Sequence, residues 1–157
     1  MKERRAWNSD TAAAMISAHA GEAGALLPIL HDVQEAFGYI PEPATPMIAQ
    51  ALNLSRAEVH GVVTFYHDLR AEPAGRHVLK LCCAEACQSC GGDALAARAE
   101  DRLGIKLGET SSDGRVTLKP VYCLGLCSVS PSAMIDGRIV GRLDEKKLDA
   151  LIAEANR

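Results

Sequence analysis

The six cysteines of this 157-residue chain are confined to two short windows, LCCAEACQSCGG at 81–92 and VYCLGLCSVSP at 121–131. Each window follows a segment with the alternating apolar pattern of a β-strand, 77–82 before the first and 116–121 before the second. Both windows therefore sit at the end of a predicted strand, where loops from different strands converge on one site. A fold that brings these two loops together is the main constraint on the chain.

The composition excludes several classes of protein. A net charge of −3 and only 4% aromatic residues argue against a nucleic-acid partner. No apolar run approaches the roughly 20 residues of a transmembrane helix, so no membrane insertion is expected. The basic start, MKERRAWNSD, leads into polar residues rather than the apolar core of a secretory signal, and we expect a cytoplasmic protein. In that reducing compartment, cysteines are typically metal ligands or redox thiols.

The first half of the chain has helical patterning. One apolar stripe at helical spacing ends at Gly38, a natural helix stop. Thr45 is predicted to cap a short helix with Pro46 at its first position, and Ser55 with Glu58 forms a capping box for the next helix. The stripe is made of Leu26, Leu27, Ile29, Leu30, Val33 and Phe37. These residues are expected to form plain core, without a cofactor.

The composition changes at 72–75, and we place a domain boundary there, giving domains 1–75 and 76–157. The second half is predicted as β-α-β-loop-β-β-α, with one helix from Gln88 to Leu103 and an Asp136-Gly137 hairpin. Asp144 is predicted to cap the last helix. A strand–helix–strand crossover implies a parallel pair, and the hairpin adds antiparallel strands. The expected fold class is α/β (α+β), with a mixed sheet in a thioredoxin-like layer.

The cysteine windows contain two candidate ligand pairs, Cys82 with Cys87 and Cys123 with Cys127. Four thiolates from two loops meet the requirement of a 2Fe-2S cluster. Cys87 lies at the start of a predicted helix, where the dipole favours a thiolate. Gly125 lets backbone amides approach a sulfur closely. We predict that these four cysteines bind the metal and the cofactor.

Two further cysteines leave the choice of ligands open. Cys83 would share a strand face with Leu79 and Leu81, which favours core packing. Cys90 lies one helical turn beyond Cys87, too far into the helix to be an obvious ligand. Neither argument excludes these thiols by itself.

Two rival functions fit parts of this pattern. Cys87-Gln88-Ser89-Cys90 is a C-x-x-C at a helix start, typical of a thiol–disulfide oxidoreductase, but such an enzyme needs no second cysteine pair. A structural zinc site also uses four cysteines, although the spacings here are looser than the usual C-x₂-C. Because we find no catalytic triad, phosphate loop or dinucleotide fingerprint, no independent substrate site and no catalytic residue is expected in the chain.

Four stretches outside the cysteine pairs complete a wider pattern: LLPILHDVQEAFGYIP, LNLSRAEVHGVVTFYHDL, LGETSSDGRVTL and CLGLCSVSP. Together with the cysteines they resemble the thioredoxin-like 2Fe-2S subunit of respiratory complex I (24 kDa type), NAD-reducing hydrogenases and NAD-dependent formate dehydrogenases. The resemblance implies an N-terminal helical bundle before a thioredoxin-like domain. It also implies one cluster on Cys82, Cys87, Cys123 and Cys127 that transfers single electrons.

The stretch FYHDLRAEPAGRHVLKLCCAEACQSCGG and the short chain are most similar to the gamma subunit of soluble molybdenum or tungsten formate dehydrogenase. This resemblance implies partners in one complex: a diaphorase subunit that binds FMN and NAD, and a formate-oxidising subunit that carries molybdopterin. The equivalent subunit of complex I or of an NAD-reducing hydrogenase is the alternative. Cys83 and Cys90 depart from the family pattern.

Overall fold

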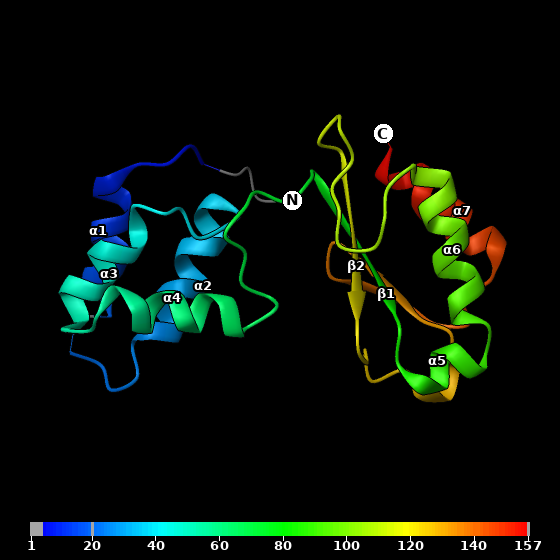
Figure 1. The fold of residues 1–157 in the computed structure, drawn as a ribbon, viewed down its shortest axis with the longest axis horizontal. Coiled ribbons are helices and arrows are strands. Elements are labelled where there is room, and N and C mark those ends of the chain that lie inside the picture. The colour runs from blue at the N-terminus through cyan, green and yellow to red at the C-terminus, as the bar shows by residue number, and fades with distance from the viewer. Residues whose placement is uncertain (1–4, 20, 157) are drawn as a thin grey trace. The chain divides into compact units, whose positions relative to one another are not determined.

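The chain divides into two compact units, the first ending at Pro73 and the second beginning at Ala74. This division comes from a computed structural model that describes residues 5–19 and 21–156 (Figure 1). Lys2, Glu3 and Arg4 of the basic start lie outside the described part. The division falls within the segment 72–75, where the composition changes.

Four helices make up the first unit: α1 (Ser9–Ala18), α2 (Leu26–Phe37), α3 (Ala44–Leu52) and α4 (Arg56–Phe65). Helix α2 has the predicted extent, and it ends because Gly38 takes the left-handed conformation with φ of 86°. The apolar stripe of α2 packs with α1, α3 and α4 into one core, as predicted. The fully buried members of this core include Ile29, Leu30, Val33, Ile48 and Val59.

One helix cap was predicted correctly in this unit and one was wrong. Ser55 and Glu58 form the predicted reciprocal capping box at the start of α4. Helix α3 instead starts one residue before Thr45, and no side chain caps it. The backbone supplies the missing acceptor, because the amide of Thr45 donates to the carbonyl of Glu42 at 3.2 Å. The tight turn at 41–44 therefore takes the place of a side-chain cap.

The second unit contains a four-stranded mixed sheet, as predicted. Its strands lie in the order β2-β1-β3-β4. They are β1 (His77–Cys82), β2 (Val116–Val121), β3 (Ala133–Ile135) and β4 (Arg138–Val140). Strands β1 and β2 are parallel, whereas β3 pairs antiparallel with both β1 and β4. Since β1 and β2 run the same way, their last residues lie at the same end of the sheet (Figure 1).

Helices α6 (Gly92–Leu103) and α7 (Glu145–Ala155) lie together beside the sheet (Figure 1). Their apolar faces and one face of the sheet form a second core. Its members include Leu79, Leu81, Ala99, Leu118, Ile135, Leu148 and Ile152. Asp144 caps α7 as predicted, and the hairpin residues Asp136 and Gly137 both have positive φ, 48° and 89°.

The single helix predicted from Gln88 to Leu103 is wrong, because two helices occupy this segment. A short helix α5 (Glu85–Ser89) ends before Gly91, whose left-handed φ of 89° interrupts the helical path. Helix α6 begins at Gly92, packed against the carbonyl of Cys87: a Cβ on Gly92 would lie 2.6 Å from that oxygen. The two glycines permit this close turn and fix Cys87 within α5.

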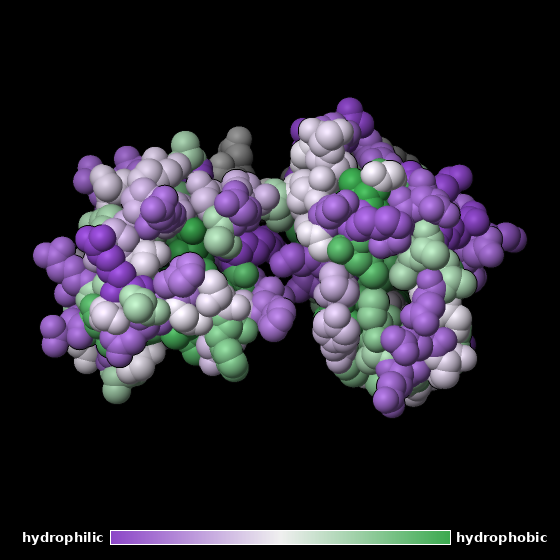
Figure 2. Space-filling view, in the orientation of Figure 1, coloured by the Kyte–Doolittle hydropathy of each residue, from purple (hydrophilic) through white to green (hydrophobic). Residues whose placement is uncertain are grey.

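Hydrophilic residues dominate the visible face of both units, and strongly apolar side chains appear only in small patches (Figure 2). None of the described helices has both the length and the apolar character that crossing a bilayer requires.

Candidate functional site

The two cysteine windows leave the sheet side by side. Cys82, the last residue of β1, is paired in register with Val121, the last residue of β2. The backbone continues this pairing, because the amide of Cys83 donates to the carbonyl of Val121 at 2.8 Å. Parallel pairing therefore brings Cys123, two residues beyond β2, to the end of the sheet where Cys82 lies.

The first pair of thiols is buried. Cys82 is 5% exposed and Cys87 is 1% exposed. Burial raises the pKa of the Cys87 thiol, but hydrogen bonds from Ser132, Cys82 and Ser130 outweigh it, and the net direction is downward. The hydroxyl of Ser132 lies 3.6 Å from the Cys87 sulfur. The structure thus stabilises a thiolate at Cys87 even though the residue is shielded from water.

The second pair of thiols is exposed and already adjacent. The sulfurs of Cys123 and Cys127 lie 3.8 Å apart, and both residues are exposed. Cys123 has a φ of 133°, a conformation that residues other than glycine rarely adopt. The amide of Gly125 donates to the Cys123 sulfur at 3.3 Å, so the loop folds back onto its own ligand atom. This amide donor agrees with the role we expected for Gly125.

Both pairs follow strands that end at the same end of the sheet, because the parallel strands β1 and β2 are paired in register to their last residues. A hydrogen bond with Cys123 is the main cause that raises the pKa of the Cys127 thiol, and charge on Cys87 and on Cys82 raises it further. The ligand set of Cys82, Cys87, Cys123 and Cys127 stays a prediction, which the placement of the two loops favours.

The two additional cysteines differ in position from these four. Cys83 lies just beyond β1 and is half-buried, so the core packing we predicted for it is wrong. Burial raises the pKa of its thiol, which donates to the carbonyl of Leu81 at 3.5 Å. The strand ends at Cys82, and the face alternation that supported the prediction ends with it. Cys90 is exposed at the end of α5, with its sulfur 4.0 Å from the Ser89 hydroxyl.

A short strap positions the second loop, and we did not predict it from the sequence. The strap consists of Gly141, Arg142 and Leu143. The amide of Arg142 donates to the carbonyl of Val129 at 2.5 Å, and that of Leu143 to the carbonyl of Pro131 at 2.8 Å. Gly141 packs on Val129, where an added Cβ would lie 2.6 Å from a side-chain carbon. Gly141 directly follows the hairpin, and this glycine is the sequence signal that could have predicted the close approach.

Ser132 was also missed. Its side chain is buried and its carbonyl accepts from the amide of Cys82 at 3.0 Å, so it contacts both cysteines of the first pair. The preceding Ser130-Pro131 bond is cis. The sequence signal that could have identified Ser132 is its position directly after Pro131, at the end of the second cysteine window.

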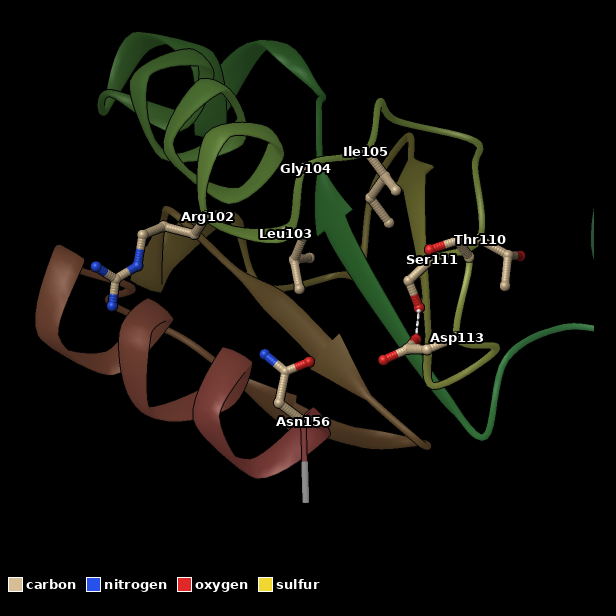
Figure 3. A pocket seen from close by; sticks show the side chains of 9 residues that line it. Arg102, Leu103, Gly104, Ile105, Thr110, Ser111, Asp113 and Asn156 are labelled. Atoms are coloured by element: carbon tan, nitrogen blue, oxygen red, sulfur yellow. Dashed lines mark hydrogen bonds between the residues drawn. The ribbon is translucent and has the colours of Figure 1, made fainter.

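A separate cavity of about 370 Å³ lies elsewhere in the second unit (Figure 3). Its lining includes Arg102, Ser111, Asp113 and Asn156. Ser111 donates to Asp113 at 2.6 Å across one side of it. The lining comes from the last turns of α6 and α7 and from the loop before β2. The cavity is thus at the opposite end of the sheet from the thiols and contains none of them.

The donor set fits an iron–sulfur group. All four donors are cysteine sulfurs, the soft ligands that iron–sulfur clusters use. They are arranged as two pairs on two loops. Within residues 5–19 and 21–156, no group of three or more His, Cys, Asp or Glu side chains is close enough to hold one metal ion. The amide of Gly125 and the hydroxyl of Ser132 supply hydrogen-bond donors to the sulfurs.

The chain is similar to several known proteins. One NADH-quinone oxidoreductase subunit of Rhizobium meliloti (strain 1021) is 40% identical over 128 residues, which are 82% of this chain and 76% of that protein. The corresponding NADH-quinone oxidoreductase subunit of Escherichia coli (strain K12) is 41% identical over 104 residues, 66% of this chain and 63% of that protein. The chain thus spans less than two thirds of the second relative.

A solved structure is also similar, the air-oxidized NAD+-reducing [NiFe]-hydrogenase, with a TM-score of 0.74 and 26% sequence identity. The match covers 84% of this chain and 23% of the hydrogenase chain. A family profile described as thioredoxin-like [2Fe-2S] ferredoxin matches residues 12–156, which is nearly the whole sequence. The chain therefore belongs to the thioredoxin-like [2Fe-2S] ferredoxin family.

Proposed function

We propose that this chain holds one 2Fe-2S cluster on Cys82, Cys87, Cys123 and Cys127 and transfers single electrons within a larger NAD-linked oxidoreductase. A bound cluster of this kind supplies one-electron redox chemistry. The chain's own residues hold the sulfurs, exclude water from the first pair and donate hydrogen bonds to the thiolates. FMN and NAD belong to a diaphorase-type partner subunit in this proposal.

The observation that carries the proposal is that both cysteine loops leave the sheet at the same end. The charges of Cys87 and Cys82 contribute to raising the pKa of the Cys127 thiol, which agrees with this placement. The parallel pairing of β1 with β2 produces this arrangement, because it ends both strands at one edge. Four thiols in two pairs, at one end of a sheet, match a cluster with two irons and two ligands on each.

Burial disfavours the thiol–disulfide oxidoreductase alternative. An attacking thiol must be accessible to its substrate. The first cysteine of Cys87-x-x-Cys90 is 1% exposed, whereas the second is exposed. A substrate disulfide would therefore meet Cys90 but not Cys87, whose thiolate the structure stabilises.

Anaerobic purification with iron and acid-labile sulfide analysis tests the ligand set. We expect about two irons and two sulfides per chain in the unaltered protein, and an EPR signal after dithionite reduction. Cys123→Ser should remove or convert the cluster, because a hard oxygen replaces a soft thiolate. The matched control Cys90→Ser should keep full iron content and an unchanged spectrum. Loss of half the iron in the control would show that the ligand set is wrong.

The parent complex is the finer part of the proposal. We propose the gamma position of a cytoplasmic formate dehydrogenase because residues 65–92 resemble that subunit. The complex I position and the NAD-reducing hydrogenase position are the alternatives, and the names of the relatives favour these two. Purification of the intact complex through a tag on this chain separates the three. Molybdopterin in the complex supports a formate dehydrogenase, and nickel supports a hydrogenase. Membrane subunits support a complex I that reduces quinone.

A further inference from the structure

The second cysteine loop is held by backbone hydrogen bonds that come from the strap at 141–143. Cys127 begins a short 3-10 helix, η1 (Cys127–Val129). Val129, the last residue of η1, accepts from the amide of Arg142, and Pro131 accepts from the amide of Leu143. The position of η1, and with it that of Cys127, therefore depends on where the strap lies.

The strap is firmly fixed at one end and strained in its middle. Leu143 is buried in the second core, so its side chain fixes the end of the strap that leads into α7. Arg142 is exposed and has a φ of 48°, a left-handed conformation that is uncommon for residues other than glycine. A residue in this conformation persists only where its surroundings hold it. Contacts with the backbone of the strap must therefore supply that support.

Lys147 makes two contacts of this kind. Its ammonium group donates to the carbonyl of Arg142 at 2.7 Å and to that of Gly141 at 3.3 Å. Lys147 lies in the first turn of α7, where the helix dipole disfavours a cation. Its side chain reaches back past the start of the helix to the strap, and the positive charge strengthens both hydrogen bonds. One side chain thus ties α7 to the strap at two neighbouring carbonyls.

We propose that Lys147 is a positioning residue for the cluster: it holds Arg142 in its left-handed conformation, and the strap then holds η1 so that Cys127 stays in place to bind iron. The proposal rests on the function proposed above. Lys147 acts through the backbone of the strap rather than on a cysteine. Loss of its two hydrogen bonds should therefore leave the ligand set unchanged but loosen the second loop, so that the cluster is lost faster.

The rate of cluster loss to excess EDTA, followed by visible absorbance of the full-length protein under anaerobic conditions, tests the effect on the site. We expect Lys147→Met to lose the cluster about fivefold faster than the unaltered protein, because methionine keeps the apolar stem but not the ammonium group. Lys147→Arg restores a charged donor and should recover most of the difference. The matched control Lys146→Met removes an exposed positive charge from the same helical turn and should behave as the unaltered protein.

A second substitution tests whether Lys147 acts through the strap. Arg142→Gly places a glycine at a φ of 48°, which glycine adopts without strain and without outside support. In the presence of Arg142→Gly, the effect of Lys147→Met on the rate of cluster loss should therefore nearly vanish. A general loss of stability would not depend on the residue at position 142. The EPR lines of the reduced cluster should be broader in Lys147→Met, because a looser loop holds the cluster in more than one geometry.

The outcomes separate this inference from the proposed function. If the unaltered protein binds no cluster, the proposed function fails and the inference fails with it. If the cluster is intact but Lys147→Met and Lys146→Met lose it at the same rate, only the inference is wrong. An effect of Lys147→Met that is equally large with and without Arg142→Gly would also overturn it.

Amide hydrogen exchange measured by NMR keeps the test decisive even if Lys147→Met takes up no iron. In the cluster-free chain, the amides of Arg142 and Leu143 should exchange several-fold faster in Lys147→Met than in Lys146→Met, because their hydrogen bonds to the second loop open more often. Equal protection of these two amides in both variants would show that Lys147 does not hold the strap.

Discussion

Ser132 contributes a hydrogen bond to the buried end of the site. Its side chain is 2% exposed, and a hydroxyl so deeply buried must find a hydrogen-bond partner. The Cys87 sulfur, 3.6 Å away, is that partner. When Cys87 is a thiolate the hydroxyl donates the bond, which is why it lowers the pKa of Cys87. The same donor would stabilise additional negative charge on a bound cluster.

Replacing this hydroxyl should therefore lower the reduction potential. In Ser132→Ala the reduced, more negative form loses more stabilisation than the oxidised form. A differential loss of about 1 kcal/mol corresponds to roughly 40 mV for one electron. EPR-monitored redox titration measures the shift, with Ser89→Ala as the control because Ser89 donates to the carbonyl of Ala86 instead. An unchanged or more positive potential in Ser132→Ala would contradict this interpretation.

At the level of single residues, the sequence was informative where chemistry is local. The two candidate ligand pairs follow from cysteine spacing and strand ends, and the structure places the two loops at the same end of the sheet. Cys83 was misplaced because strand alternation holds only within a strand, and β1 ends one residue earlier. The difference in burial between the two pairs was not predictable, because the local pattern does not show what α5 and β3 cover.

Among the helices and strands, the predictions were correct where the residues of a turn or a helix cap favour one local conformation by themselves. Asp136-Gly137 and the Ser55 capping box are examples, and both are confirmed. The break between α5 and α6 was missed because Gly91-Gly92 within an alanine-rich stretch was read as part of one helix. The break arises from packing of Gly92 against the Cys87 carbonyl, a contact that the helical pattern does not show.

A histidine links the first two helices. His19 ends α1, and its ring nitrogens lie 3.0 Å from a Glu22 oxygen and 2.9 Å from an Asp32 oxygen in α2. The hydrogen bond with Glu22, followed by that with Asp32, raises the pKa of His19 above its ordinary value of 6.5. Because the folded state holds the proton more tightly, protonated His19 stabilises the fold. This contribution is complete below the unfolded pKa and is lost as pH rises through the higher folded pKa.

Replacing His19 should therefore make stability less dependent on pH. Between about pH 6 and about pH 9, the denaturation midpoint of the unaltered protein should fall more than that of His19→Gln. Chemical denaturation followed by far-UV circular dichroism measures both midpoints. Asp32→Asn, which removes one of the two acceptors, should give an intermediate slope. Parallel pH profiles for the unaltered protein and His19→Gln would refute the link.

For the molecule as a whole, the two cores are separate. The buried apolar residues of the first core lie between Ala12 and Leu69, and those of the second between Leu79 and Ala155. Each unit thus has a complete core of its own, which is the usual condition for independent folding. All six cysteines belong to the second unit. We propose on this basis that the thioredoxin-like unit is an autonomous cluster-binding domain.

A fragment of residues 74–157 should fold and take up iron and sulfide with the visible spectrum of the full chain. It should begin at Ala74 because the amide of Gly75 donates to the buried Thr117 hydroxyl at 2.7 Å. A fragment of residues 77–157 leaves that hydroxyl with one partner fewer and should be less stable by roughly 1 kcal/mol. Iron analysis and thermal denaturation compare the two fragments with the full chain. A 74–157 fragment that stays colourless under conditions where the full chain binds iron would show that cluster binding requires the helical unit.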